Sequence, residues 1–204
     1  MSGPMPPKPL DLGFERLVVV GTGSIGVMHL PFWLNWLRLA HPGIQTRAVV
    51  TRSATRFVTR QALTSVTGHP VREDVWPEEP EPVGLHVELA EWAEAIAVYP
   101  ATLHFVGRFA LGLADTPTLL AAQCATVPVG IAPALPPGGA QSAAYMTHLK
   151  ALEGRRNVVV APPERGPSTG TGRNDGWVAA DLPALLGLIE ERRLQLADTG
   201  GQLP

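Results

Sequence analysis

The side chains best suited to chemistry lie in one stretch near the middle of the sequence. His86 opens a short amphipathic segment, and an apolar run at residues 95–99 then leads into Pro-Ala-Thr at 100–102 and a second helical segment. An imidazole titrates near neutral pH, so His86 is able to take up or relay a proton, for example from a thiol. A strand that runs into small and hydroxyl-bearing residues at the start of a helix is how α/β proteins hold a cofactor. We therefore expect a cofactor site here. Taken by itself, His86 fits either a catalytic group or a solvated residue at the start of a helix.

A second candidate for ligand binding is the glycine-rich turn GTGSIG at residues 21–26. Between a strand and a helix, this G-x-G-x-x-G pattern is typical of dinucleotide-binding folds. The acidic residue that would hold a ribose 2′-hydroxyl is missing after the second strand, where Arg52 and Ser53 stand instead. Two hypotheses remain open: Arg52 contacts the 2′-phosphate of NADP, or backbone amides and the hydroxyls of Ser24, Thr51 and Ser53 hold a phosphate. Ser53 is also a candidate cap for the helix that follows it.

The composition limits the kinds of partner. The chain has 204 residues and a formal net charge of −2, which fits one domain and leaves no basic face for nucleic acid or membrane lipids. No apolar run reaches the roughly 18 residues that a membrane-spanning helix needs. The first residues lack the apolar centre of a signal peptide, and the single cysteine, Cys124, excludes an internal disulfide. Because no histidine pair has metal-ligand spacing with a carboxylate either, we expect a cytoplasmic protein with no nucleic-acid, membrane or metal partner.

Strands alternate with helices along the chain. Short apolar runs predict strands at residues 17–20, 46–51, 95–99, 127–132 and 157–161. Helical patterns are found at residues 25–39, 54–63, 141–153 and 182–197, with further helices around His86 and after residue 102. This alternation implies a parallel sheet covered on both faces. We expect an α/β fold with a doubly wound parallel sheet in a flavodoxin-like, Rossmann-type three-layer (αβα) arrangement, which binds ligands at the carboxyl ends of its strands.

Turn-forming residues set the boundaries of this single domain. Prolines in residues 1–14 predict a flexible N-terminal arm, so the domain is expected to span residues 15–198. Residues 162–176 are rich in Pro and Gly and predict a long loop that acts as a functional flap. Asp115 is expected to cap the helix that follows it.

The central stretch resembles the homo-oligomeric flavin-containing cysteine decarboxylases. This family includes phosphopantothenoylcysteine decarboxylase and the lantibiotic-type enzymes that process C-terminal cysteines of precursor peptides. In the family a catalytic histidine precedes a helix, a strand and Pro-Ala-Ser/Thr-Ala-Asn-Thr. Here Pro-Ala-Thr at 100–102 matches the first half of that motif, and His104 stands at the usual Asn position. The Thr-x-Ser-Ala-x-x-Phe segment at 51–57 is a second match.

The resemblance implies FMN as the cofactor, with FAD as the other possibility, and assigns contacts to individual residues. The residues expected to contact the cofactor are Gly23, Ser24, Ile25, Thr51, Ser53, Phe57, Pro100, Ala101, Thr102 and His104. The family's substrate motif, Pro-x-Met-Asn, corresponds to a stretch that contains Pro133 and Leu135, with Pro136 at the Asn position. Another group must then bind a substrate carboxylate. The candidates are Arg173, in a Gly-x-Gly-Arg sequence like that of the family's flap, Arg165, and backbone amides of the Gly-rich stretch.

By this resemblance the protein oxidatively decarboxylates the C-terminal cysteine of a ribosomally made, lanthipeptide-type precursor peptide to an enethiol. His86 would assist deprotonation of the thiol and would face the flavin of a neighbouring subunit in a homo-oligomer, either a trimer or a dodecamer. The predicted flap has no cysteine, which favours a reaction that stops at the enethiol. Three alternatives remain: a phosphopantothenoylcysteine decarboxylase-like enzyme, a UbiX-like flavin prenyltransferase, and a non-catalytic flavin-binding regulatory subunit.

Overall fold

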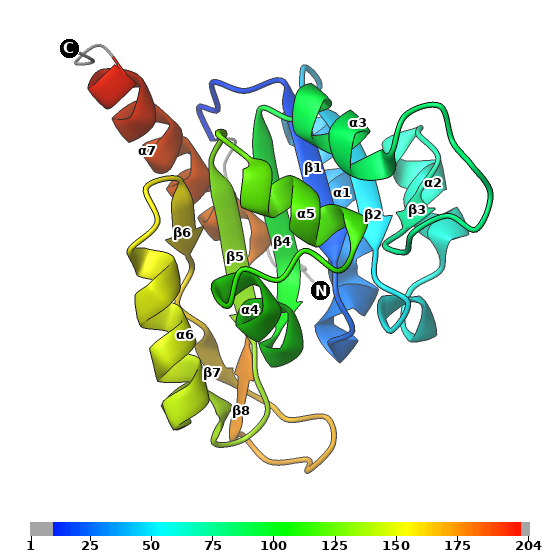
Figure 1. The fold of residues 1–204 in the computed structure, drawn as a ribbon. Helices are drawn as coiled ribbons and strands as arrows, with labels where there is room; N and C mark the ends of the chain where they lie inside the picture. The colour runs from blue at the N-terminus through cyan, green and yellow to red at the C-terminus, as the bar shows by residue number, and fades with distance from the viewer. Residues whose placement is uncertain (1–9, 201–204) are drawn as a thin grey trace.

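A six-stranded parallel sheet organises the computed structural model, which describes residues 10–200 (Figure 1). Its strands are β1 (Arg16–Gly21), β2 (Gln45–Val50), β3 (Arg72–Glu73), β4 (Ala95–Thr102), β5 (Val129–Ala134) and β6 (Val158–Val160). They lie in the order β3-β2-β1-β4-β5-β6. Without the two-residue β3 this is the flavodoxin-like order, and β3 extends it to the order of a Rossmann sheet. The predicted α/β doubly wound fold is therefore confirmed.

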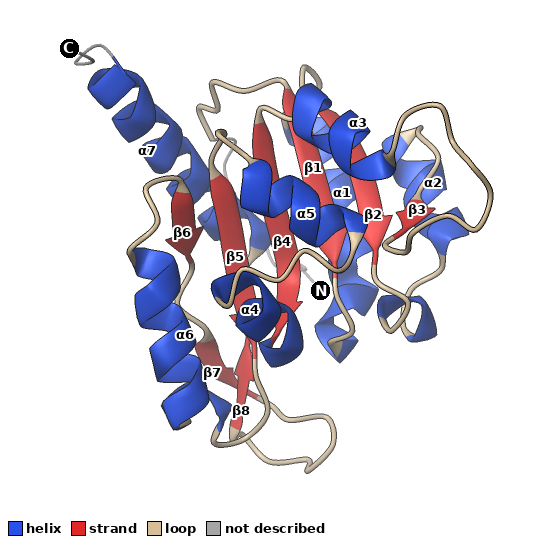
Figure 2. Ribbon diagram, in the orientation of Figure 1, coloured by secondary structure: helices blue, strands red, loops and turns tan. Residues whose placement is uncertain are grey.

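Helices cover both faces of the sheet (Figure 2). The α-helices are α1 (Leu30–Ala40), α2 (Arg60–Thr67), α3 (Leu85–Trp92), α4 (Leu103–Ala110), α5 (Pro117–Cys124), α6 (Ala143–Glu153) and α7 (Leu182–Gly200). The short 3₁₀ helices are η1 (Ile25–His29), η2 (Ala54–Arg56) and η3 (Gly139–Gln141). One apolar cluster joins the sheet to α1, α2 and α7, and a second joins its other face to α3, α4, α5 and α6.

The sequence of β1 explains why the sheet is buried on both faces. Successive side chains of a strand point to opposite faces. Leu17 and Val19 accordingly belong to the first cluster, and Val18 and Val20 to the second. All four are at most 2% exposed, as expected for a central parallel strand that has no polar face.

Two predicted helices begin later than expected. The segment expected as one helix at 25–39 is η1 followed by α1, whose first turn contains Pro31, a residue suited to a helix start. Ser53 does not cap a helix: its backbone is already helical, and only η2 follows it. The cap is Thr59, whose extended backbone lets its hydroxyl accept a 3.1 Å hydrogen bond from the N–H of Ala62 in α2.

The predicted flap contains a small antiparallel hairpin, β7 (Glu164–Gly166) and β8 (Gly176–Val178). It is attached to the end of β5, because Leu135 N donates to Trp177 O at 2.8 Å and Trp177 N donates to Leu135 O at 3.1 Å. The hairpin therefore lies at the carboxyl edge of the sheet, beyond β5 (Figure 1).

The N-terminal end of the described chain packs on the domain. Residues 1–9 of the predicted arm lie outside the described residues. Phe14 is buried in the first cluster, and the N–H of Gly13 donates a 3.0 Å hydrogen bond to the carboxylate of Glu190 in α7. Across residues 10–200, no helix has both the length and the apolar character that crossing a membrane requires.

Candidate functional site

A cavity of about 410 Å³ opens at the carboxyl ends of four adjacent strands. Each strand places one polar residue in its lining: Thr22 follows β1, Thr51 follows β2, Asp74 follows β3, and Thr102 ends β4. In doubly wound sheets, ligands bind outside the carboxyl ends of the strands, where the strand order reverses. This volume lies within the range of small-molecule and cofactor sites, so the cavity is the candidate binding site.

Thr22 fixes the geometry where the order reverses, between β1 and β4. Its hydroxyl donates to the carbonyl of Pro100 at 2.6 Å and accepts from the N–H of Thr102 at 2.9 Å. The side chain of Thr102 in turn accepts from the N–H of Phe105 at 3.3 Å and caps α4. Because Thr22 is only 1% exposed, these bonds are shielded from water and hold the Pro-Ala-Thr segment against β1. The strand expected at residues 95–99 is longer than predicted, because residues 100–102 form the last part of β4.

The turn after β1 approaches the segment after β2 very closely. A Cβ atom added to Gly23 would lie 2.4 Å from Ser53 Oγ, so a larger residue at this position would force Ser53 to move. Ser53 Oγ is also 3.2 Å from Thr51 Oγ1, and both residues line the cavity. The cavity lining thus contains four of the predicted cofactor contacts: Thr51, Ser53, Thr102 and His104.

The other predicted cofactor residues lie around the cavity without lining it. This group consists of Gly23, Ser24, Ile25, Phe57, Pro100 and Ala101. Ile25 and Phe57 are 43% and 41% exposed, which leaves them open to a ligand that extends beyond the cavity or to another chain. Ala101 is fully buried, so only its backbone is able to contribute.

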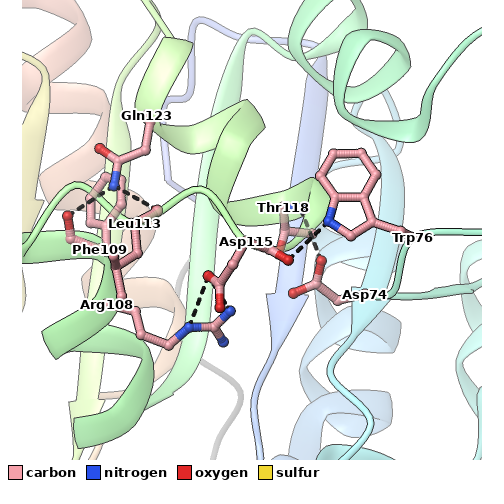
Figure 3. A network of polar contacts seen from close by, with 8 residues as sticks. All are labelled: Asp74, Trp76, Arg108, Phe109, Leu113, Asp115, Thr118 and Gln123. Atoms are coloured by element: carbon pink, nitrogen blue, oxygen red, sulfur yellow. Dashed lines mark hydrogen bonds and ion pairs between the residues drawn. The ribbon is translucent and has the colours of Figure 1, made fainter.

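Three arginines line the cavity beside the hydroxyls: Arg52, Arg56 and Arg108. Arg108 is paired with Asp115, with Nε donating to the carboxylate at 3.1 Å (Figure 3). This hydrogen bond holds the pKa of Asp115 below its usual range. Within residues 10–200, Arg52 and Arg56 make no ion pair with a carboxylate. Their guanidinium groups are therefore available to an anionic group such as a phosphate.

Asp74 caps α5, a role that the sequence suggested for Asp115. One carboxylate oxygen of Asp74 accepts a 2.9 Å hydrogen bond from the N–H of Thr118, in the first turn of that helix (Figure 3). The predicted cap at Asp115 is therefore wrong: its carboxylate is directed to Arg108, and its backbone carbonyl accepts from the indole N–H of Trp76 at 2.9 Å.

His86 lies outside the cavity lining, at the start of α3. Its ring meets the ring of Trp76 edge to face, with centroids 5.3 Å apart. The Nδ1 atom is buried and has no hydrogen-bond partner within the described part of the chain. A Cβ atom on Gly84 would lie 2.8 Å from the imidazole, so glycine at this helix start makes room for the ring. The protein therefore packs His86 closely on one side, through Trp76 and Gly84, outside the lining of its own cavity.

The three predicted substrate residues also lie outside the cavity lining. Pro133 pairs with Ala101 at the ends of β5 and β4. Leu135 is buried and connects β5 to the hairpin. Arg173 lies in the hairpin loop, where its Nε donates to the carboxylate of Asp175 at 2.7 Å. These residues lie along the β5 side of the sheet edge and in the hairpin beside it.

Several cavity residues were not assigned to the site from the sequence: Thr22, Arg56, Asp74, Phe105, Arg108 and Thr116. Arg52 was considered only as a contact for the 2′-phosphate of NADP. Two signals were available for some of them. Thr22 lies inside the GTGSIG motif, and Arg108 lies one helical turn after His104 on α4, so the two share a face. Asp74 follows a two-residue strand, too short to be recognised as a pattern.

Fold and cavity together define an α/β protein with a candidate cofactor site at the switch point of a doubly wound sheet. The family model described as Flavoprotein matches residues 7–178, so the chain belongs to the flavoprotein family. The resemblance to the homo-oligomeric flavin-containing cysteine decarboxylases is confirmed.

Similar proteins cover nearly the whole chain. The sequence is 31% identical over 172 residues to the cypemycin cysteine dehydrogenase (decarboxylating) of a Streptomyces species, over 84% of this chain and 88% of that protein. The crystal structure of the cypemycin decarboxylase CypD superimposes with a TM-score of 0.75 and 28% identity, over 92% of this chain and 98% of that one. The FMN-dependent cysteine decarboxylase SpaF gives a TM-score of 0.71 and 25% identity, over 90% and 97% of the two chains.

A second type of relative matches a shorter region. The Coenzyme A biosynthesis bifunctional protein CoaBC of Bacillus subtilis is 40% identical over 101 residues, which is 48% of this chain. That alignment covers only 24% of the bifunctional protein.

Proposed function

We propose that this protein is an FMN-dependent decarboxylase that acts on the C-terminal cysteine of a ribosomally made precursor peptide and leaves an enethiol. The observation that carries the proposal is the cavity at the switch point, lined by hydroxyls and arginines. The relatives that match most of the chain support the reaction, because they are named as cysteine dehydrogenases or decarboxylases.

The cavity residues fit a flavin mononucleotide. The hydroxyls of Thr51 and Ser53, with the unpaired guanidinium groups of Arg52 and Arg56, provide donors for a phosphate. Because Gly23 has no side chain, the turn after β1 packs directly against Ser53, in the segment from Thr51 to Ser53 that we propose binds the phosphate. A bound flavin would supply the redox chemistry by accepting a hydride from the cysteine Cβ, and the carboxylate would then leave as CO₂.

His86 is the proposed acceptor of the thiol proton. An imidazole is able to exchange a proton near neutral pH. Because His86 does not line the cavity of its own chain, the proposal places it at the cofactor of a neighbouring subunit in a homo-oligomer, a trimer or a dodecamer. Its close packing against Trp76 supports this role, because the contact holds the imidazole ring in one orientation.

The hairpin formed by β7 and β8 is the proposed substrate flap. It is attached to β5 at Leu135 and carries Arg173, which is 71% exposed at its side chain. Binding of a peptide carboxylate by Arg173 would require exchange of its ion pair with Asp175. The flap contains no thiol able to return electrons to the product, which supports a reaction that ends at the enethiol.

The test begins with the visible spectrum of the purified protein and identification of any released chromophore. We expect flavin bands and FMN. Incubation with a Cys-terminated peptide should then give a product lighter by CO₂ and two hydrogens, whereas the same peptide ending in Ser should be unchanged. A protein that neither contains nor takes up FMN or FAD would overturn the cofactor assignment, and a flavoprotein inert toward a panel of Cys-terminated peptides would overturn the substrate class.

The match to CoaBC supports a second candidate, decarboxylation of phosphopantothenoylcysteine. The two candidates differ in substrate and in net redox change. Phosphopantothenoylcysteine should be untouched if the peptide assignment is right. Loss of CO₂ alone from this small substrate would favour the second candidate.

A further inference from the structure

Three buried polar atoms that lack a hydrogen-bond partner within the described residues belong to side chains at one corner of the cavity. Six buried side-chain atoms lack a hydrogen-bond partner within residues 10–200, and three of them are Asp74 Oδ2, Thr116 Oγ1 and Thr118 Oγ1. Asp74 and Thr116 line the cavity. Thr118 is adjacent, because its N–H donates to the other oxygen of Asp74 at 2.9 Å. Half of the unpartnered atoms therefore belong to one corner, at the start of α5.

Helix capping explains only one half of the Asp74 carboxylate. Oδ1 is used by the N–H of Thr118, whereas Oδ2 is left without a donor in a residue that is 3% exposed. Buried polar groups in folded proteins are nearly always hydrogen-bonded, and an unpaired one costs about 1–3 kcal/mol. Capping alone requires a single acceptor. The unused second oxygen of Asp74 therefore indicates a further hydrogen-bond donor, which a bound ligand would supply.

The charges of the corner define what that ligand group must be. An ionised carboxylate only accepts hydrogen bonds, and a threonine hydroxyl both donates and accepts. Arg108, the cation of this part of the cavity, is already bound to Asp115. A second anion beside Asp74 would be repelled, so the phosphate belongs with Arg52 and Arg56, and a neutral N–H or O–H group belongs here.

We propose that Asp74 and Thr116 form a hydrogen-bonding subsite for a neutral donor of the bound cofactor. This inference rests on the proposed FMN site and adds to it a contact from β3 and α5. FMN has two kinds of neutral donor, the imide N–H of its ring and the hydroxyls of its ribityl chain. Asp74 accepts from one of them while it caps α5, so cofactor binding also fixes the start of that helix.

The substitution Asp74→Asn separates the two roles of the side chain. The N–H of Thr118 can only donate, so the amide must turn its oxygen toward Thr118 and its NH₂ group toward the cavity. The cap is kept, but an imide N–H of the ligand would now face another donor. A ribityl hydroxyl would accept from the NH₂ group, and its charge-assisted hydrogen bond to the carboxylate would be replaced by a weaker neutral one. We expect the thermal midpoint of the cofactor-free protein to stay within about 2 °C of wild type. The dissociation constant for FMN, measured by quenching of flavin fluorescence, should rise about 10- to 100-fold.

Glu73→Gln is the matched control, because it removes the same charge from the neighbouring residue of β3, which does not line the cavity. It should bind FMN as wild type does. Thr116→Val is a second probe: removing an unpaired buried hydroxyl should leave the cofactor-free protein as stable as before, yet weaken FMN binding several-fold. Wild-type affinity for FMN in both Asp74→Asn and Thr116→Val would overturn the subsite.

An FMN analogue methylated on its imide nitrogen identifies the donor. If the imide N–H is the partner of Asp74, the wild type binds the analogue weakly and Asp74→Asn adds no further loss. If a ribityl hydroxyl is the partner, Asp74→Asn weakens FMN and the analogue equally. Failure of the wild type itself to bind FMN would instead overturn the proposed function, so the two failures are distinguishable.

Discussion

The hydroxyl of Thr22 joins the ends of two strands, accepting from the N–H of Thr102 at 2.9 Å while it donates to the carbonyl of Pro100 at 2.6 Å. Both bonds are made by a side chain that is 1% exposed, so neither backbone group has water as a substitute partner. The wall of the cavity between β1 and β4 therefore depends on one hydroxyl.

Replacement of Thr22 by Val, which keeps the shape but removes the hydroxyl, should lower the free energy of unfolding by about 1–3 kcal/mol. FMN binding should weaken as well, because Thr102 lines the cavity. Chemical denaturation and flavin titration measure the two effects. Thr22→Ser is the control: it retains the hydroxyl and should keep most of the affinity. Equal affinity in Thr22→Val and wild type would contradict this role of Thr22 in the site.

Replacement of Gly23 by Ala should disrupt the segment from Thr51 to Ser53, which we propose binds the phosphate. The added methyl group would lie 2.4 Å from Ser53 Oγ, so Ser53 must shift away from its contact with Thr51. Overpacking of this kind costs about 1–3 kcal/mol, and we expect FMN affinity to fall about tenfold or more. Gly43→Ala is the control, because nothing lies within 4 Å of its added Cβ. If Gly43→Ala lowered FMN affinity as much as Gly23→Ala, the close approach would not be the cause.

The strands and helices, and the position of the cavity at the carboxyl ends of the strands, could be predicted because local sequence patterns determine both. Apolar runs such as 17–20 marked the strands, and the alternation with helices required a parallel sheet whose carboxyl ends carry the ligand. Thr51 and Ser53 were found in this way, since they directly follow β2.

The polar partners were harder to predict because they come from distant parts of the chain. Asp74 and Thr118 are 44 residues apart, so the cap of α5 depends on tertiary packing, and the nearby Asp115 was the natural but wrong choice. His86 was identified by resemblance alone. Its position outside the cavity lining of its own chain depends on tertiary packing, including its contact with Trp76, which a linear pattern does not encode.

Glu190 should make stability depend on pH. Hydrogen bonds from Arg193 at 2.9 Å and from the N–H of Gly13 at 3.0 Å hold the pKa of Glu190 below its usual range. A lowered pKa in the folded state adds stability above the unfolded pKa of about 4.3, and this contribution is lost as the pH falls through the folded value. Glu190→Gln should therefore be less stable than wild type by about 1–2 kcal/mol at pH 7, and this difference should be smaller at about pH 3.

Urea denaturation at both pH values measures this difference. Glu191→Gln removes an exposed neighbouring carboxylate and should differ from wild type at neither pH. A constant deficit of Glu190→Gln across the range would show that packing, and not ionisation, links α7 to the N-terminal segment.

His86→Asn should separate cofactor binding from turnover. The residue does not line the cavity of its own chain, so the variant should retain FMN and its visible spectrum, while turnover falls by about 10²–10⁴-fold through loss of the proton acceptor. His69→Asn, which changes an exposed histidine between α2 and β3, is the control and should be fully active. Wild-type turnover in His86→Asn would contradict the catalytic assignment.

Mixed oligomers then test which subunit receives His86. Chains with His86→Asn keep an intact cavity, and chains with Gly23→Ala keep the histidine but bind FMN poorly. If His86 serves the neighbouring cofactor, oligomers containing both chains include sites that combine a functional cavity with a functional histidine. At an FMN concentration too low to saturate Gly23→Ala, their activity should then exceed that of either variant alone. Chains that use their own His86 have no such combination, because one half of every site is always defective. Mixed oligomers that form, as mass spectrometry would verify, but show no such gain in activity would assign His86 to its own chain's cofactor.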